Sequence, residues 1–582
     1  MKPCLHCSAG FEVTDADRAF YDQVSPVFNS IKYSIPEPLL CPNCRQQRRL
    51  SFRNERKLYK RNCDLCKKSM VSIYQPQTPF PVYCQECWWS DKWDALEYGQ
   101  EFDFGKSFFE QFRDLQKRVS RLSLVNIKEE NAEYGNQSMG NKNCYWNISI
   151  KDCEDVLYSY RIFNGENAID CTNVFDGELV YECIDSRKLW DCRWCIQCEE
   201  MGSSDFCFAC KGCESCFGCV NLRHKKYYFF NEDCKTKEVY IKRINDFFNE
   251  QKGDRRYVFK KFLYWKRNFG HHFSHNIGNE NCIGGDIQYS QNCFSSFDIR
   301  HSDGLRYCMT LSGQKDSMDI DFDDDSELMM ECTGMESNYH NAFCHTSFES
   351  KNIFYSNLCF QNSYDLFGCI GLNHKQYCIL NRQYSKEEYE ELVPKIIEHM
   401  KQTGEWGEFF PPALSPFGYN ETVAQEYFPM TREEIIEQNK KMDNSGVEPL
   451  HATALQIQKF NWSDYESPPP TVAKIITKEM MKNLPDDISK IPNDVLSWAL
   501  TCEVSGKLFI IQKPELEFYR KMNLSIPHRH PDIRHADRMK LRNPRKLWKR
   551  TCGNCGTAIE TTYSPDRPEK VLCEKCYLEV VV

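Results

Sequence analysis

Residues 45–66 read RQQRRLSFRNERKLYKRNCDLC, a basic segment that runs directly into the CxxC pair formed by Cys63 and Cys66. A second CxxC pair, Cys84 and Cys87, follows after 17 residues. Two such pairs can supply four thiolates in a tetrahedron, which is what a structural zinc ion requires. We therefore predict a zinc finger that begins with this segment.

The same arrangement returns near the C-terminus. Residues 534–555, RHADRMKLRNPRKLWKRTCGNC, run into a CxxC pair, and 17 residues again separate that pair from the closing one. Ten of eighteen residues are identical between 49–66 and 538–555. The predicted zinc ligands of this copy are Cys552, Cys555, Cys573 and Cys576.

Another finger precedes the first one. Cys4 and Cys7 form one CxxC pair and Cys41 and Cys44 form another, so we predict a further zinc site at the N-terminus. This unit resembles the probable zinc-ribbon, treble-clef family on CLHCSAGF, the Ala-Phe-Tyr run at 19–21, a Pro at 38 and CPNCR. The resemblance implies a knuckle that carries Cys4 and Cys7 and a helix whose first turn carries Cys44.

The C-terminal counterpart of that finger is degenerate. It retains Cys502, but Ser505, His530 and Ile533 stand at the other three ligand positions. We expect this finger to keep its shape without zinc. The alternative is a site that uses Cys502, His530 and a neighbour such as His528 or His535. The main interpretation predicts three zinc ions per chain.

A basic connector lies between the two fingers of each end. Arg guanidinium groups suit phosphate oxygens, so each connector could bind a nucleic-acid backbone. An equally weighted interpretation is that these residues pair with the acidic middle of the same protein. The candidate residues are Arg45, Arg48, Arg49, Arg53, Arg56, Lys57, Lys60, Arg61, Arg534, Arg538, Arg542, Arg545, Lys546, Lys549 and Arg550.

The middle of the chain is a duplication. FGCVNLRHKKYYFFN at 217–231 returns as FGCIGLNHKQYCILN at 367–381, and Cys and Tyr positions upstream match at an offset of 149. Residues of about 135–250 and 280–400 are therefore two copies of one module. Each copy ends in a predicted helix, with Thr236 as the N-cap of the first and a capping box that begins at Ser385 in the second.

Short β-prone segments recur roughly every 11 residues within a module, separated by Gly, Asn and Asp. This pattern predicts a parallel β-helix or a similar solenoid, and a sandwich of short antiparallel strands is the alternative. The many Cys, including CxxCxxC runs such as Cys192, Cys195 and Cys198, are interpreted as small buried side chains that stack coil on coil. Extra zinc in the first module and an iron–sulfur cluster are the other readings.

The acidic run at 316–327, DSMDIDFDDDSE, is predicted to be a solvated turn. Oxygen-rich runs can bind calcium, but Asp324 stands where an EF-hand requires Gly.

The fold class that follows is a multidomain, mainly β protein in which tandem treble-clef or zinc-ribbon fingers flank a duplicated, Cys-rich, solenoid-like middle. The predicted domains are 1–98 (two fingers), 99–134 (a connecting helix), 135–250 and 280–400 (the modules), 404–497 (a Pro-rich linker with short helices) and 498–582 (two fingers).

Composition narrows the class of protein. The 582 residues include 34 Cys and carry a net charge of −9. No apolar run is long enough to span a membrane, and the N-terminus lacks the apolar segment of a secretory signal. Because cytoplasmic thiols stay reduced, we expect a cytoplasmic protein whose CxxC pairs hold metal.

As a whole the chain resembles uncharacterised, Cys-rich zinc-ribbon proteins of candidate-phyla bacteria. The resemblance rests on CPNCRQQRRLSFRNERKLYKRNC, CQECWWSDKWD, FGCVNLRHKKYYFFN, FGYNETVAQEYFPM and IRHADRMKLRNPRKLWKR. It implies zinc binding and no particular activity.

Three functions follow as hypotheses. The first is a non-enzymatic protein that contacts nucleic acid (RNA or a ribonucleoprotein) through the connectors. The second is a structural or adaptor protein whose modules bind other proteins. The third is a carbohydrate-active β-helix, although the sequence has no recognisable nucleophile–base pair, phosphate loop or three-ligand zinc site.

Overall fold

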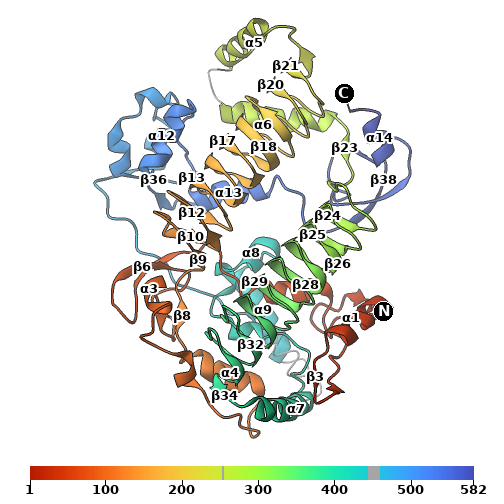
Figure 1. Cartoon of the computed structure of the whole chain (residues 1–582). Helices are drawn as coiled ribbons and strands as arrows, with labels where there is room; N and C mark the ends of the chain where they lie inside the picture. The colour runs from red at the N-terminus through yellow and green to blue at the C-terminus, as the bar shows by residue number, and fades with distance from the viewer. Residues whose placement is uncertain (252–254, 444–458, 582) are drawn as a thin grey trace. The chain divides into compact units, whose positions relative to one another are not determined.

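The computed structural model describes residues 1–251, 255–443 and 459–581 (Figure 1). The chain divides into two compact units, each built from two separate parts of the sequence. Unit 1 comprises Met1–Leu124 and Ser274–Tyr465, and unit 2 comprises Val125–Phe273 and Glu466–Val582. The N-terminal fingers therefore belong with the second Cys-rich module, and the C-terminal fingers belong with the first.

Each module is a solenoid of short parallel strands, as the repeat pattern predicts. Residues pair with residues 12 positions further along the chain, so that in unit 2 Val156 pairs with Ala168 and Ala168 with Val180. In unit 1 Ile299 pairs with Leu311 in the same way. A typical rung therefore contains 12 residues, slightly more than the spacing suggested by the sequence, although Glu280 pairs with Gln291 and Lys351 with Tyr364.

The strands of the two solenoids are short. In unit 2 they are β9 (Asn126–Ile127), β10 (Tyr134–Asn136), β11 (Ser138–Met139), β12 (Tyr145–Ile148), β13 (Glu154–Leu157), β14 (Tyr160–Phe163), β15 (Glu166–Ile169), β16 (Thr172–Phe175), β17 (Glu178–Tyr181), β18 (Ile184–Arg193), β19 (Glu199–Gly202), β20 (Glu214–Phe217), β21 (Lys226–Phe229) and β22 (Glu232–Asp233). In unit 1 they are β24 (Ile283–Gln288), β25 (Phe294–Arg300), β26 (Asp303–Arg306), β27 (Met309–Ser312), β28 (Lys315–Asp324), β29 (Met330–Glu336), β30 (His345–Phe348), β31 (Lys351–Phe354), β32 (Tyr364–Phe367), β33 (Gln376–Ile379) and β34 (Arg382–Gln383). The last strand of each solenoid pairs antiparallel to its neighbour.

A three-residue period shapes every rung. From residue 143 to residue 230, and from 286 to 361, every third residue has a positive φ. The residue after each of these corners is turned inward, and in unit 2 such residues form one buried cluster. A rung is therefore four sides of three residues. Because positive φ is uncommon for residues other than Gly, Asn and Asp are favoured at corners, where Asn173 donates to Asp185 on the next rung.

Small polar and thiol side chains share the interior with aliphatic ones. The thiol of Cys183 donates to the carbonyls of Tyr181, in its own rung, and of Cys192, in the next. Ser186 makes the equivalent pair of bonds to Ile184 and Cys195. These contacts satisfy backbone carbonyls inside a narrow core, and they confirm the interpretation of the module Cys as small buried side chains.

The helices that end the modules begin where the sequence predicts. α5 (Lys237–Glu250) follows the N-cap Thr236, and α7 (Lys386–Gln402) follows Ser385, whose capping box with Glu388 is complete. In unit 2, α6 (Arg255–Trp265) and η2 (Lys266–Asn268) continue the chain to β23 (His271–His272).

The connecting segment of unit 1 is less helical than its periodicity predicts. α4 (Phe108–Gln116) occupies only part of 99–134, and the chain is extended again by β8 (Arg121–Leu122). Phe104, which lies within the predicted connecting helix, precedes α4 and is exposed.

The Pro-rich linker is divided between the units. Its first part contains η3 (Pro412–Leu414), η4 (Tyr419–Glu421), α8 (Val423–Tyr427) and α9 (Arg432–Asp443), and it docks on the fingers of unit 1, where Phe417 stacks on Tyr74. Residues 444–458 of the predicted linker lie outside the described residues. From Glu466 onward the linker, with β35 (Lys474–Ile476), α11 (Lys478–Met481), η5 (Ile488–Lys490) and η6 (Asn493–Ser497), belongs to unit 2.

The finger regions consist of small hairpins and helices. In unit 1 they are β1 (Lys2–Pro3), β2 (Gly10–Phe11), α1 (Asp15–Val24), β3 (Val27–Phe28), β4 (Ile31–Lys32), α2 (Pro42–Leu50), β5 (Tyr59–Asn62), β6 (Ser69–Ser72), β7 (Val82–Tyr83), α3 (Gln85–Trp88) and η1 (Ala95–Tyr98). In unit 2 they are β36 (Trp498–Thr501), β37 (Leu508–Phe509), α12 (Lys513–Lys521), α13 (Pro531–Met539), β38 (Trp548–Thr551), β39 (Ala558–Thr561), β40 (Val571–Leu572) and α14 (Glu574–Leu578).

Within the described ranges, no helix has both the length and the apolar character needed to cross a membrane.

Candidate metal centres and the arginine contacts

Three groups of four Cys are assembled by the fingers. In each group the first CxxC pair lies in a turn, the third Cys is the N-cap of a short helix and the fourth lies in that helix. All twelve predicted ligands are brought together in this way. The groups are Cys4, Cys7, Cys41 and Cys44; Cys63, Cys66, Cys84 and Cys87; and Cys552, Cys555, Cys573 and Cys576.

The spacing of the sulfur atoms fits one metal ion per group. All four Sγ atoms of a group lie within 4.8 Å of one another. Cys7 and Cys41 are separated by 3.7 Å, Cys66 and Cys84 by 3.8 Å, and the third group has the same 3.7 Å spacing. A tetrahedral ion with four sulfurs at about 2.3 Å would place them about 3.8 Å apart, so the groups have the dimensions of a tetrathiolate zinc site.

Backbone N–H groups point at the first sulfur of each group. The N–H of Cys41 donates to Cys4, that of Cys84 to Cys63, and that of Cys573 to Cys552. Burial raises the pKa of Cys63, but the backbone N–H groups of Cys84, Cys66 and Leu65 outweigh burial and lower the pKa to about 7. For Cys552 the same balance gives a pKa of about 6. The thiolate form of this first ligand is therefore favoured before any ion enters, whereas the pKa of the fourth ligand is raised to about 12 at both Cys87 and Cys576.

The degenerate finger keeps the frame of the others. His530 is the N-cap of α13 as Cys41 is of α2, and Ile533 lies in the first turn as Cys44 does. The N–H of Ser505 donates to the sulfur of Cys502. Among the residues that the structure describes, no group of three or more potential ligands other than the three tetra-Cys groups is close enough to hold an ion.

The helix α2 carries predicted nucleic-acid-binding residues, and these face the solenoid of unit 1. Arg45 NH2 lies 2.8 Å from Asp319, and Arg49 Nε lies 2.8 Å from Asp321. Arg49 NH1 also lies 3.3 Å from Asp319. Both Arg side chains and both Asp side chains are at most 3 % exposed. They are therefore engaged inside the protein and are not on its surface.

A third Arg of α2 joins the same network. Arg48 lies 3.1 Å from Glu331 on β29 and 2.7 Å from Glu408, which belongs to the linker. Burial raises the pKa of Glu331, but Arg48, Arg49 and Arg45 outweigh it and lower that pKa below its usual range. The finger helix, the solenoid and the linker of unit 1 are thus held by one charged cluster.

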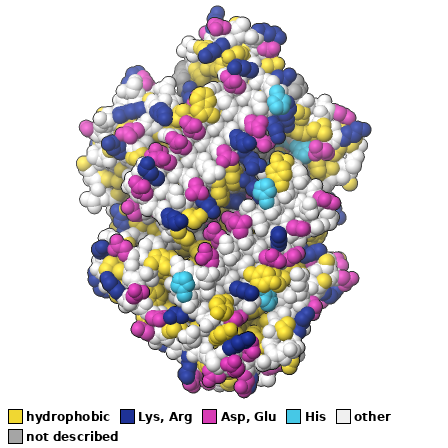
Figure 2. Space-filling view, viewed as in Figure 1, with side chains coloured by type: hydrophobic (Ala, Val, Ile, Leu, Met, Phe, Trp, Pro, Cys, Tyr) yellow, Lys and Arg dark blue, Asp and Glu magenta, His cyan; other side chains and the backbone are white. Residues whose placement is uncertain are grey.

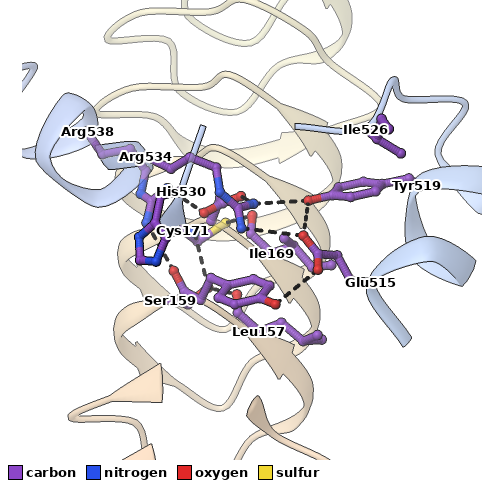
Figure 3. A network of polar contacts seen from close by, with 12 residues as sticks. Leu157, Ser159, Ile169, Cys171, Glu515, Tyr519, Ile526, His530, Arg534 and Arg538 are labelled. Atoms are coloured by element: carbon purple, nitrogen blue, oxygen red, sulfur yellow. Dashed lines mark hydrogen bonds and ion pairs between the residues drawn. The ribbon is translucent and has the colours of Figure 1, made fainter. Parts of the chain in front are cut away.

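The C-terminal connector repeats the contact in unit 2 (Figure 3). Arg538 NH1 lies 2.7 Å from one oxygen of Asp170, and Arg534 pairs with the other oxygen. Arg534 also lies 3.4 Å from Glu515 and 3.1 Å from the hydroxyl of Tyr519, both on α12. Figure 3 shows these side chains as one continuous polar network between the finger helices and the solenoid.

The two networks are equivalent in sequence. Arg534 and Arg538 follow Arg45 and Arg49 by 489 residues, as the fingers do, and Asp170 precedes Asp319 by the 149 residues that separate the modules. Asp170 and Asp319 both occupy corners with positive φ. One aspartate at a corner of the solenoid therefore receives two arginines of a finger helix in both units.

The other predicted contact residues divide into buried and exposed ones. Arg53 pairs with Glu55, and Arg542 pairs with Asp185 at 2.9 Å. Arg56 is buried, Lys57 and Arg545 are half-buried, and the guanidinium groups of Arg61 and Arg550 donate to nearby carbonyls. Of the fifteen candidates, Lys60, Lys546 and Lys549 are the exposed ones.

The prediction for the acidic run was wrong. Residues 315–324 form β28, and Asp319, Asp321 and Asp323 are buried in it. Asp323 points into the solenoid, where Ser326 and Gln314 donate to it. A dense acidic run is normally solvated, but here the arginines of α2 neutralise Asp319 and Asp321. Asp170 and Asp319 occupy the same position in the two modules, 149 residues apart. This correspondence was the signal that could have identified them as partners of the repeated arginines.

Compared with models of protein families, the chain has no match, and a search of curated proteins finds none either.

Proposed function

We propose that this chain is a non-enzymatic, zinc-binding scaffold in which the fingers are structural parts of each unit. The observation that carries the proposal is the buried contact of Arg45 and Arg49 with Asp319, repeated by Arg534 and Arg538 with Asp170. A guanidinium group that is buried against a carboxylate is not available to a phosphate. The basic connectors thus serve as internal clamps, which favours the adaptor hypothesis over nucleic-acid binding.

Zinc is the metal that the three sites fit best. Four thiolates in a closed tetrahedron are typical of structural zinc and leave no open position for catalysis. A knuckle followed by a helix that carries the last two ligands also supports the treble-clef reading of the fingers. None of the 34 Cys forms a disulfide, which fits a reducing, cytoplasmic compartment.

The solenoids supply the surface for partners in this proposal. One side of each is covered by its finger helices, and the remaining rungs present regularly spaced side chains, as in other repeat proteins with extended binding faces. On the face that Figure 2 shows, Lys and Arg side chains are intermixed with Asp and Glu. A continuous basic stripe, the usual footprint of a nucleic-acid-binding surface, is not a feature of that face.

Exposed lysines favour nucleic acid as a second candidate. Lys60 and Lys549 occupy equivalent positions of the β5–β6 and β38–β39 hairpins, and both are exposed. Lys546 adds a third exposed cation next to one of them. Two equivalent hairpins with an exposed lysine could bind phosphate groups without the buried arginines.

A salt series on the intact, zinc-loaded protein separates the two candidates. Fluorescence anisotropy with labelled single-stranded RNA and duplex DNA is measured from low to physiological salt. The scaffold proposal predicts no saturable binding, whereas backbone contacts give an affinity that falls steeply as salt rises. Salt-dependent binding that Lys60→Gln, Lys546→Gln and Lys549→Gln together abolish would overturn the scaffold in favour of the second candidate.

A further inference from the structure

A groove lies on one side of the unit 1 solenoid, and no part of the proposed function uses it. It has a volume of about 920 Å³ and is formed by five successive rungs. Its middle row consists of residues whose backbones pair between neighbouring rungs, namely Lys315, Glu327, Tyr339, Lys351 and Tyr364. A second row, at corners of the same rungs, consists of Gly313, Asp325, Ser337, Glu349 and Asn362.

Acceptors and aromatic rings are exposed together in this groove. Tyr339 is 44 % exposed and Tyr364 is 37 % exposed. The carboxylates of Asp325, Glu327 and Glu349 have no side-chain partner among the residues that the structure describes, although lysines stand on adjacent rungs. On the unit 2 solenoid, by contrast, Lys211 and Lys226 are paired with glutamates of the neighbouring rung. The exposed carboxylates of the groove are therefore free to accept from a ligand, whereas the buried Ser and Asn side chains of its lining bond inside the solenoid.

The charge of the groove restricts the class of ligand. Two lysines and three carboxylates leave it close to neutral, and its other exposed side chains are those of Ser337, Asn362 and the two Tyr. A polyanion would meet unscreened carboxylates, and an apolar ligand would leave polar groups unpaired. A neutral molecule with hydroxyl groups on its edges and C–H groups on its faces satisfies both kinds of lining side chain.

The spacing of the rings suggests an extended chain of such molecules. Tyr339 and Tyr364 stand two rungs apart, which is roughly 10 Å at the usual distance between paired strands. This separation is comparable to the repeat of an extended disaccharide. The ammonium group of Lys351 lies 5.4 Å from the ring of Tyr339 and is exposed, so it can move aside when a ring stacks there.

An exposed aromatic residue also lies on the equivalent side of the unit 2 solenoid. Trp190, which corresponds to Tyr339 at the 149-residue offset, is 53 % exposed. Glu178 and Glu200 correspond to Glu327 and Glu349 and are also exposed. An exposed aromatic residue flanked by carboxylates thus occurs at one place in both modules.

We propose that this groove binds a neutral oligosaccharide, with pyranose rings stacked on Tyr339 and Tyr364 and their hydroxyl groups donating to Asp325, Glu327 and Glu349. The inference rests on the proposed use of the solenoid faces for binding and names the ligand class of one face. It involves no bond cleavage, so it is distinct from a carbohydrate-active enzyme.

The test uses the intact, zinc-loaded chain. Binding of cellohexaose, xylohexaose, mannohexaose and the hexamer of N-acetylglucosamine is measured by calorimetry, and the matching polysaccharides are used in affinity electrophoresis. At least one probe is expected to bind with a millimolar or lower dissociation constant. Tyr339→Ala is expected to weaken that binding at least about fivefold, because one stacking contact is lost.

The matched control is Tyr289→Ala. Tyr289 is 48 % exposed on the same solenoid, lies outside the groove and stacks on His301. This variant is expected to bind as the unchanged protein does, and thermal unfolding checks that both variants are folded. Absence of binding to all four probes, equal losses in both Tyr variants, or competition by single-stranded RNA at the groove would each overturn the proposal.

These outcomes are distinguishable from a failure of the scaffold proposal. That proposal fails in the salt series with RNA and DNA, which does not depend on Tyr339. A protein could bind oligosaccharide and still bind nucleic acid through its exposed lysines, or do neither.

Discussion

Arg538 NH1 lies 2.7 Å from the carboxylate of Asp170, and both side chains are almost completely buried. Arg49 has the same relationship to Asp319 in the other unit, at 3.3 Å. In each unit one carboxylate receives two guanidinium groups, so the aspartate is the central member of the contact. Its removal tests whether the connectors act as clamps.

Replacing Asp170 with Asn is expected to destabilise unit 2 by about 3–5 kcal/mol, because Arg534 and Arg538 would lose the anion that balances their buried charge. The measurement is urea unfolding followed by fluorescence. Asp233→Asn is the matched control, since Asp233 pairs with Lys235 on the surface of the same solenoid. Similar midpoints for the two variants would show that the clamp contributes nothing.

Metal content gives a second prediction. Three tetra-Cys groups imply three zinc ions per chain by elemental analysis, and Cys573→Ser should reduce that number by one. Cys234→Ser is the control, because Cys234 lies in the solenoid of unit 2 away from the three groups, and it should retain all three. Iron in the purified protein, or loss of zinc in the control, would contradict the assignment.

The degenerate finger can be repaired if its frame is intact. Ser505→Cys combined with Ile533→Cys would complete a site with Cys502 and His530, since His530 and Ile533 occupy the helix positions of Cys41 and Cys44. We expect four zinc ions per chain in this double variant. Ser505→Cys alone should keep the three ions of the unchanged protein. A count that stays at three in the double variant would show that the finger no longer has the metal-binding geometry.

The sequence predicts the three tetra-Cys groups well because their signal is local. CxxC spacing and the turn that it forms are determined within a few residues, so Cys63, Cys66, Cys84 and Cys87 could be paired without tertiary information. The start of α7 is predicted for the same reason. The duplicated modules are recognised because residues 217–231 return as a similar segment at 367–381. The fingers contact solenoid residues that lie far away in the sequence. These contacts could not be predicted from the spacing of the Cys residues.

The CxxCxxC runs of the modules follow from the geometry of a rung. Runs such as Cys207, Cys210 and Cys213 suggest a metal motif, but three residues is the length of one side of a rung, and each Cys is simply the inward residue of its side. The burial of the acidic run, by contrast, depends on residues far away in the sequence. Asp319 and Asp321 are buried only because arginines more than 270 residues away neutralise them, and no window along the chain contains both partners.

Acid should destabilise unit 1 through His345. Burial lowers the pKa of this side chain to about 3, well below the value of an unfolded chain. Between these two values the unfolded state binds the proton and the folded state does not, so stability falls as pH falls. From pH 7 to pH 5 the expected loss is about 2 kcal/mol.

The variant His345→Gln isolates this contribution, because it removes the titrating group while the zinc sites respond to acid as before. Its stability should decline less than that of the unchanged protein over the same pH range, as measured by urea unfolding. His374→Gln is the control, since His374 is exposed on the same solenoid. Identical pH profiles for the unchanged protein and His345→Gln would mean that the histidine is not buried in its neutral form.

Thiol reactivity should follow the architecture of the rungs. A thiolate, not a thiol, is the nucleophile in alkylation, and burial raises the pKa of interior Cys such as Cys293, to about 12. Cys282, one rung earlier, is partly exposed. In the folded, zinc-loaded protein we expect iodoacetamide to modify Cys282 first among the module thiols, with Cys293 protected until the solenoid unfolds. Peptide mapping by mass spectrometry measures both sites in one sample, and a chelator should add the twelve finger thiols without exposing Cys293. Equal rates at Cys282 and Cys293 before unfolding would contradict a closed, thiol-lined interior.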